Sequence, residues 1–286
     1  MFSLPFRIAE YIGRKKRNGM TLFAYAFYTL FCLSRYMPIR QICEDYRVTV
    51  SAMGLIAYVL NDRWTQFIFM LCWFYLIGDG PFFDCTIQYV LLRSGRIKWA
   101  TGVFLFVLLS AAYFLLWAAV LCVVCAFPYV NFQTEWDSVI RSLAAIRTLG
   151  QNYHAHFIFT PYIHMNYSVL QAFGWSLSLH FLLLVAFGMF VSLFNSLSKQ
   201  QVGILIAGMF LIMDMSAYQW FASDYYYFYS PLSLVTLNVL DLHGTTYRPT
   251  PDYSLCFFGI AILLITTLFL LIMHRRSIVA IKHSAV

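Results

Sequence analysis

Long apolar runs dominate this chain and decide what it can fold into. A helix needs about 20 mostly apolar residues to cross the hydrocarbon core of a bilayer. Five runs meet or nearly meet that length, at residues 20–38, 101–127, 167–194, 201–221 and 253–273. A sixth run, at 64–80, is short, but it contains Trp64 and Trp73, aromatic residues of the kind that anchor helices at membrane interfaces. The sequence therefore predicts an all-α, polytopic membrane protein, a single transmembrane domain of six helices over residues 1–286.

The composition supports the membrane class. Hydrophobic residues fill 61% of the positions and charged residues 11%, which leaves too little polar surface to cover a soluble globule. The net charge of +7 would also suit nucleic-acid binding, but the basic residues stand at the ends of apolar runs, where they orient a chain in a membrane. We therefore expect the lipid bilayer as a partner, and no nucleic acid.

The basic residues are divided unevenly between the two sides of a six-span arrangement. With both termini inside, the cytoplasmic side receives Arg7, Arg14, Lys15, Lys16, Arg17, Arg93, Arg96, Lys98, Lys199, Arg275, Arg276 and Lys282. The outer side keeps fewer basic residues, and acidic residues largely offset them. This bias predicts that both termini are cytoplasmic. A seventh span at 48–60 would place the two terminal basic clusters on opposite faces, so we expect a half-inserted or interfacial helix there.

The first 19 residues have a pattern of their own. At helical spacing, one face carries Arg7, Glu10, Arg14 and Arg17, and the other carries Leu4, Ile8, Tyr11 and Ile12. This amphipathic pattern predicts an interfacial helix on the inner leaflet, because its basic face favours anionic headgroups. A disordered basic tail that serves only as a topology signal is the alternative.

A basic, amphipathic segment at 81–99 separates the second and third runs. Arg93, Arg96 and Lys98 would each cost roughly 2.5–3.5 kcal/mol at the centre of a bilayer, so the segment must lie at the membrane surface. A helix along that surface would turn Gln88, Arg93 and Arg96 toward a soluble partner. Gly95 would permit the turn into the next span. Plain positive-inside anchoring is the other interpretation of these charges.

This layout resembles the membrane subunit of ABC-2 type (type V) ABC exporters, which are bacterial permeases of similar length. The resemblance rests on four features: the interfacial N-terminal helix, the basic segment at 91–99, a very short inner loop at 195–201 and an apolar outer hairpin before the last span. It implies that the segment at about 83–99 docks on a separate cytoplasmic ABC ATPase. The residues assigned to that coupling role are Gln88, Arg93, Gly95, Arg96 and Lys98.

The resemblance also implies the partners and the location. We expect a second permease copy or paralogue, and a bacterial cell membrane. No G-x-x-x-x-G-K-[ST] phosphate loop occurs in the sequence, so ATP and Mg would be bound by the partner ATPase, and this chain would be a transport subunit without enzyme activity or a cofactor of its own. The expected cargo is amphipathic or hydrophobic, such as a peptide. A membrane sensor or immunity protein without transport, or an integral membrane enzyme, are the alternatives.

Polar residues within or near the apolar runs are the remaining candidates. Asp214 lies inside the fifth run with Ser216 and Tyr218 close by, and an ionisable residue at that depth either lines a pathway or bonds to a neighbouring helix. His154, His156 and His164 could be zinc ligands. Histidines are also common in solvated loops, so we expect no metal site. The apolar stretch at 232–240 is too short to span and predicts a hairpin that re-enters the outer leaflet.

Overall fold

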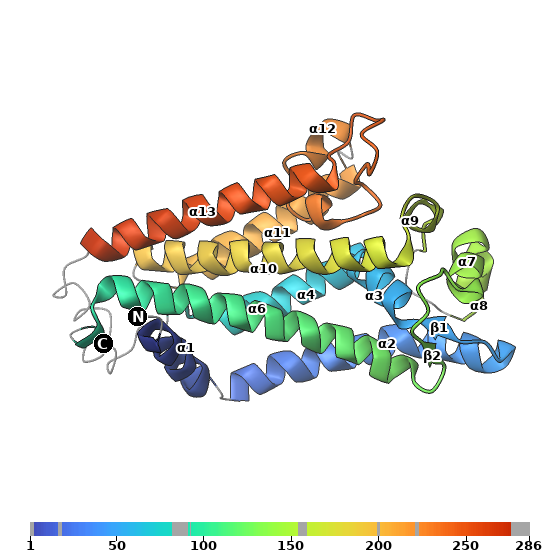
Figure 1. The fold of residues 1–286 in the computed structure, drawn as a ribbon, viewed down its shortest axis with the longest axis horizontal. Coiled ribbons are helices and arrows are strands. Elements are labelled where there is room, and N and C mark those ends of the chain that lie inside the picture. Colours follow the sequence, from blue (N-terminus) through green and yellow to red (C-terminus); the bar gives the residue numbers. More distant parts are fainter. Residues whose placement is uncertain are drawn as a thin grey trace.

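The computed structural model is a bundle of long helices that run along one axis (Figure 1). It describes residues 3–16, 19–81, 91, 93–153, 159–198, 201–220 and 223–275. The longer helices are α1 (Ser3–Lys16), α2 (Gly19–Tyr46), α4 (Arg63–Ile77), α6 (Arg96–Ala126), α10 (Val169–Ser198), α11 (Val202–Trp220) and α13 (Pro251–Arg275). The shorter ones are α3 (Ala52–Leu60), α7 (Ser138–Ala145), α8 (Arg147–Asn152), α9 (Pro161–Asn166), α12 (Asp224–Tyr227) and the 3₁₀ turn η1 (Ser233–Val235). Two short parallel strands, β1 (Val50–Ser51) and β2 (Val130–Asn131), complete the described part.

Four of the described helices, α6, α10, α11 and α13, are long and apolar enough to cross a membrane. The expected all-α membrane class is confirmed at this level. The helix for the first run, α2, is 28 residues long and includes Pro38, so it continues well past residue 38. The helix for the second run, α4, has only 15 residues.

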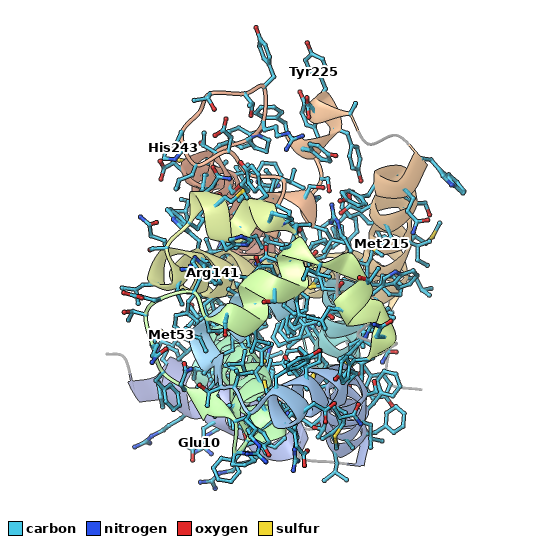
Figure 2. All side chains as sticks on the ribbon, turned by 90° about the vertical axis from the view of Figure 1, so that its right-hand side faces the viewer. Glu10, Met53, Arg141, Met215, Tyr225 and His243 are labelled. Atoms are coloured by element: carbon cyan, nitrogen blue, oxygen red, sulfur yellow. The ribbon has the colours of Figure 1, made fainter. Side chains whose placement is uncertain are left out.

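The bundle has two chemically different ends (Figure 1). At the end drawn on the left, α1, the start of α6, the end of α10, the start of α11 and the end of α13 lie together; we call this the basic end, since Arg14, Arg93, Lys98 and Arg275 belong to it. At the opposite, cap end lie both strands, α7, α9 and α12. Figure 2 looks onto the cap end, where α7 with Arg141 crosses the middle and Tyr225 and His243 stand out at the top.

Helix α10 is the centre of the bundle. It packs against α3, α4, α6, α11 and α13. Of the 18 residues that form its apolar segment, 67% are buried, against 11% for the corresponding segment of α13. Gly188 permits a close approach to α6, because a Cβ there would lie 2.6 Å from Val107. Trp73 of α4 donates from its indole nitrogen to the Leu184 carbonyl of α10 at 2.9 Å. The core is thus fixed by close packing and by a hydrogen bond that satisfies the buried indole.

The run at 48–60, expected to be half-inserted or interfacial, forms helix α3 in the interior, with eight of its nine residues buried. Ser51 caps its start by accepting from the Gly54 amide, and Asp62 caps the start of α4 by accepting from the Thr65 amide at 2.9 Å. Because α4 starts at its own cap only two residues after α3 ends at Leu60, the chain breaks between these two helices. The polar residues at this break reach the site described below.

Asp137 links the strands to α7 at the cap end. Its carboxylate accepts from the Ile140 amide at 2.9 Å, which caps α7, and from the Ser51 amide at 2.6 Å. Burial raises the pKa of Asp137, and these amide hydrogen bonds partly oppose the increase. The bond to the Ser51 amide joins the start of α3 to the start of α7, although Ser51 and Asp137 are 86 positions apart in the chain.

Candidate functional site

A partly buried polar cluster lies at the cap end, where α4 begins beside α11. We define the cap-end cluster as Arg63, Asp214, Tyr218, Tyr226 and Ser233. The Arg63 guanidinium lies over the Tyr218 ring, with 3.9 Å from Cζ to the ring centroid. Its Nη2 donates to the Ser233 hydroxyl, whereas Nε and Nη1 are buried without a partner in the described part of the chain. Burial of a cation without hydrogen-bond partners costs free energy, and the aromatic face compensates for part of that cost.

Asp214 is 6% exposed and bonds to two segments beyond its own helix. The Tyr226 hydroxyl donates to its Oδ1, and the same hydroxyl lies 2.8 Å from the Asp214 backbone oxygen. The Leu232 amide donates to Oδ2 at 3.2 Å. One carboxylate oxygen therefore holds α12, and the other holds the stretch that follows it. Of the two roles open to Asp214, these bonds favour the structural one.

The stretch at 230–241 is buried although most of it is not helical. Leu234, Val235, Leu237 and Leu240 are each 0% exposed. Its backbone amides find acceptors outside regular structure: Leu237 donates to Oδ1 of Asn61, and Asp241 donates to the Pro249 carbonyl at 2.9 Å. Irregular backbone tolerates an apolar interior only when its polar groups are satisfied in this way. We call this stretch the buried strap.

Residues at the α3–α4 break supply most of the remaining partners. Asn61 donates to the Ser176 hydroxyl of α10 at 2.7 Å while it accepts from the buried strap. Gln66 donates to the Thr236 hydroxyl at 3.0 Å and to the Leu60 carbonyl at 2.9 Å. The polar residues at the α3–α4 break thus fix the strap against α10.

Two of the three candidate pathway residues, Asp214 and Tyr218, lie in one cluster. Ser216 is half-buried on the same helix, and none of the cluster's bonds given above involves it. Sequence reasoning missed Arg63, Tyr226 and Asn61. A usable signal existed, because Asn61, Asp62 and Arg63 are three consecutive polar residues between two apolar runs.

The proposed coupling residues lie at the basic end. Arg93 and Lys98 are exposed, and Gly95, with φ of +80°, forms the turn from which α6 starts. Arg96 and Lys98 belong to the first turn of α6. Arg96 donates to the His274 carbonyl at 3.2 Å and so ties α6 to the last turn of α13. Gln88 lies outside the described residues.

Asn195 joins three helices near the same end, and sequence reasoning did not single it out. Its side-chain amide donates to the carbonyls of Gly78 and Gly80, at 2.7 and 2.6 Å, just after α4. Its Oδ1 accepts from the Gly203 amide of α11 at 2.7 Å. One side chain therefore satisfies three backbone groups and holds the end of α10 and the start of α11 against the end of α4.

The histidines do not form a metal site in the described part of the chain, where no group of three or more His, Cys, Asp or Glu side chains has suitable geometry. His164 instead bonds through Nδ1 to the Tyr58 hydroxyl at 3.2 Å. Burial, together with the nearby Arg141, lowers its pKa. His154 and His156 lie outside the described residues. The chain matches no protein-family model, no curated protein sequence and no solved structure.

Proposed function

We propose that this chain is the membrane-spanning permease subunit of an ATP-driven exporter of the ABC-2 type. Its six passes would be α2, the α3–α4 pair, α6, α10, α11 and α13, with both termini in the cytoplasm. The 28 residues of α2 amount to about 42 Å of helix, and the 9 and 15 residues of α3 and α4 to about 36 Å, against a hydrocarbon core of about 30 Å.

The geometry of the basic end carries this assignment. Arg93 and Lys98 are exposed where the chain enters α6, at the same end as α1 and the end of α13. Positive charge at one end of a bundle favours the cytoplasmic side. An exposed basic segment beside the helix ends, tied to α13 by Arg96, is also a suitable surface for a soluble protein to push on.

In this proposal the energy comes from a separate cytoplasmic ATPase that binds ATP and Mg. A second copy of the chain, or a paralogue, completes the pathway, and the cargo is amphipathic or hydrophobic. The buried strap would be the re-entrant outer hairpin and would close the outer end of the subunit. Its hydrogen bonds to Asp214 and Asn61 support a fixed plug there.

The test is co-purification of an ATPase with the tagged chain from native membranes in mild detergent. We expect an ATPase with a phosphate-binding loop to be retained, and Arg93→Glu with Lys98→Glu to reduce its recovery at least tenfold while the chain still inserts. Arg141→Glu, which reverses an exposed charge at the cap end, is the matched control and should change nothing. If no ATPase is recovered with the wild-type chain, or if the charge reversal leaves recovery unchanged, the proposal is wrong.

A further inference from the structure

A crevice of about 730 Å³ opens on the side of the bundle between α1, α2, α4 and α6. Its wall is mainly apolar, with Phe6 and Ala9 from α1, Tyr25 from α2, Ile77 from α4, and Phe106 and Leu109 from α6. This volume lies within the range of about 300–1,000 Å³ that is usual for sites that hold small organic ligands. The crevice is distant from the cap-end cluster and is separate from the proposed coupling residues.

The crevice has a charged rim on one side only. Glu10 and Arg14 of α1 line it, and they form an exposed ion pair with 2.6 Å between Arg14 Nη2 and Glu10 Oε1. Their side chains are 53% and 77% exposed, so the pair faces outward instead of into the protein interior. Exposed pairs of this kind are weak, and an anionic group can compete for the guanidinium.

Helix α1 is held in place firmly enough to form a permanent wall. Ile8 and Ile12 are 3% and 2% exposed. Gly102 of α6 lets α1 approach closely, since a Cβ at that position would lie 2.5 Å from the Ile8 side chain. The face predicted to be apolar thus packs on α6, and the face with Arg7, Glu10 and Arg14 stays exposed.

We propose that this crevice binds one anionic phospholipid, with an acyl chain between α1 and the bundle and the phosphate at Arg14. Charge complementarity selects this occupant: the wall suits an acyl chain, the rim offers a guanidinium, and residues 14–17 of the sequence are all basic. Site binding would also fix α1 at the membrane surface. The inference depends only on a membrane location and is independent of the transport proposal.

Native mass spectrometry of the full chain tests it, after purification from nanodiscs of phosphatidylglycerol and phosphatidylcholine in equal amounts. We expect one phosphatidylglycerol to be retained per chain, and 10 mM inorganic phosphate not to displace it. Gly13→Leu should abolish retention by filling the crevice, where a Cβ at Gly13 lies 3.7 Å from the Phe106 ring, an ordinary contact. Gly208→Leu is the matched control, because open space surrounds that glycine on α11.

Two charge variants keep the result independent of folding, since both positions are exposed. Arg14→Gln should weaken phosphatidylglycerol binding about fivefold. Glu10→Gln should strengthen it, because the competing carboxylate is removed. Equal retention of phosphatidylcholine, displacement by phosphate, normal retention by Gly13→Leu, or weaker binding in Glu10→Gln would each overturn the proposal.

Discussion

The guanidinium of Arg63 lies over the ring of Tyr218, at 3.9 Å from Cζ to the ring centroid, and joins the start of α4 to α11. Its single hydrogen bond in the described part of the chain goes to Ser233 of the buried strap. One arginine thereby connects two helices and the strap. The face of the ring attracts the cation and compensates for part of the hydration that a surface guanidinium would have.

We therefore expect Tyr218→Leu to lower the free energy of unfolding by about 0.5–2 kcal/mol through loss of the cation–π contact. Tyr218→Phe keeps the ring and should lie close to the wild type. Thermal unfolding in detergent, compared among the three proteins, provides the measurement. Equal losses in the Phe and Leu variants would show that the hydroxyl, and not the ring, supports Arg63.

Asp214 and Tyr226 should behave as a coupled pair. Asp214→Leu leaves the Leu232 amide and the Tyr226 hydroxyl without their acceptor and should cost about 1–3 kcal/mol for each group that stays buried. Asp214→Asn keeps one acceptor and should cost less. A double-mutant cycle of Asp214→Asn with Tyr226→Phe should give a coupling energy of about 0.5–3 kcal/mol. If the losses of the two single variants simply add in the double variant, the two side chains do not interact.

Asp241 makes the loop after the buried strap sensitive to acid. It is buried, which raises its pKa, but the Thr246 and Thr245 hydroxyls and the amides of Thr246 and His243 all donate to it and lower the pKa to about 2. Because the folded pKa is below the unfolded value of about 3.9, the carboxylate stabilises the loop above pH 4 and this contribution is lost as the pH falls toward 2.

Hydrogen exchange at the Thr246 amide, which donates to Asp241 at 2.6 Å, should report this loss. Protection, corrected for the intrinsic pH dependence of exchange, should be constant above pH 4 and decrease between pH 4 and 2. In Asp241→Asn it should be lower at neutral pH and insensitive to this range. A pH-dependent decrease that survives in Asp241→Asn would assign the effect to another carboxylate.

The membrane class and the order of the long helices could be predicted from the sequence. The length of each apolar run and the basic residues at its ends are local features of the chain. The N-terminal amphipathic pattern was equally clear: Ile8 and Ile12 are buried and Arg7 and Arg14 are exposed. The length of the run at 48–60 did not predict that α3 would be buried inside the protein. It is buried because α6 and α10, which come later in the chain, pack against it.

The polar contacts were much harder to predict, since they pair residues far apart in the chain. Asn61 meets Ser176 and Leu237 across 115 and 176 positions, and nothing local to Asn61 indicates either partner. Asp214 was visible as a buried carboxylate, but its partner Tyr226 lies after the end of the helix, in an aromatic run that reads as an interface belt. Partner identity depends on tertiary packing, which periodicity does not encode.

The placement of the two ends can be tested by labelling in right-side-out and inverted membrane vesicles. Lys98→Cys at the basic end and Glu135→Cys at the cap end are both exposed sites. A membrane-impermeant maleimide should label Lys98→Cys only from the cytoplasmic face and Glu135→Cys only from the outer face, with the wild-type chain as the background. Labelling of both from one face would exclude an odd number of crossings between them.

The last prediction concerns two glycines of α11 in opposite settings. A Cβ on Gly203 would lie 2.4 Å from the Val191 carbonyl and 2.8 Å from Oδ1 of Asn195, whereas a Cβ on Gly208 would meet open space. Gly203→Ala should therefore force α11 away from α10 and break the bond from the Gly203 amide to Asn195, at a cost of roughly 1–3 kcal/mol. Gly208→Ala should instead stabilise the helix by about 0.5–1 kcal/mol, because alanine is the better helix former.

Asn195→Ala provides the independent check on that contact. It leaves the Gly203 amide and the carbonyls of Gly78 and Gly80 without their partner, so it should destabilise the protein as Gly203→Ala does. Since both variants break the same hydrogen bond, their combination should cost clearly less than the sum of the two losses measured by thermal unfolding. Full additivity, or a stable Gly203→Ala variant, would mean that α11 does not pack on α10 through Gly203 in the membrane.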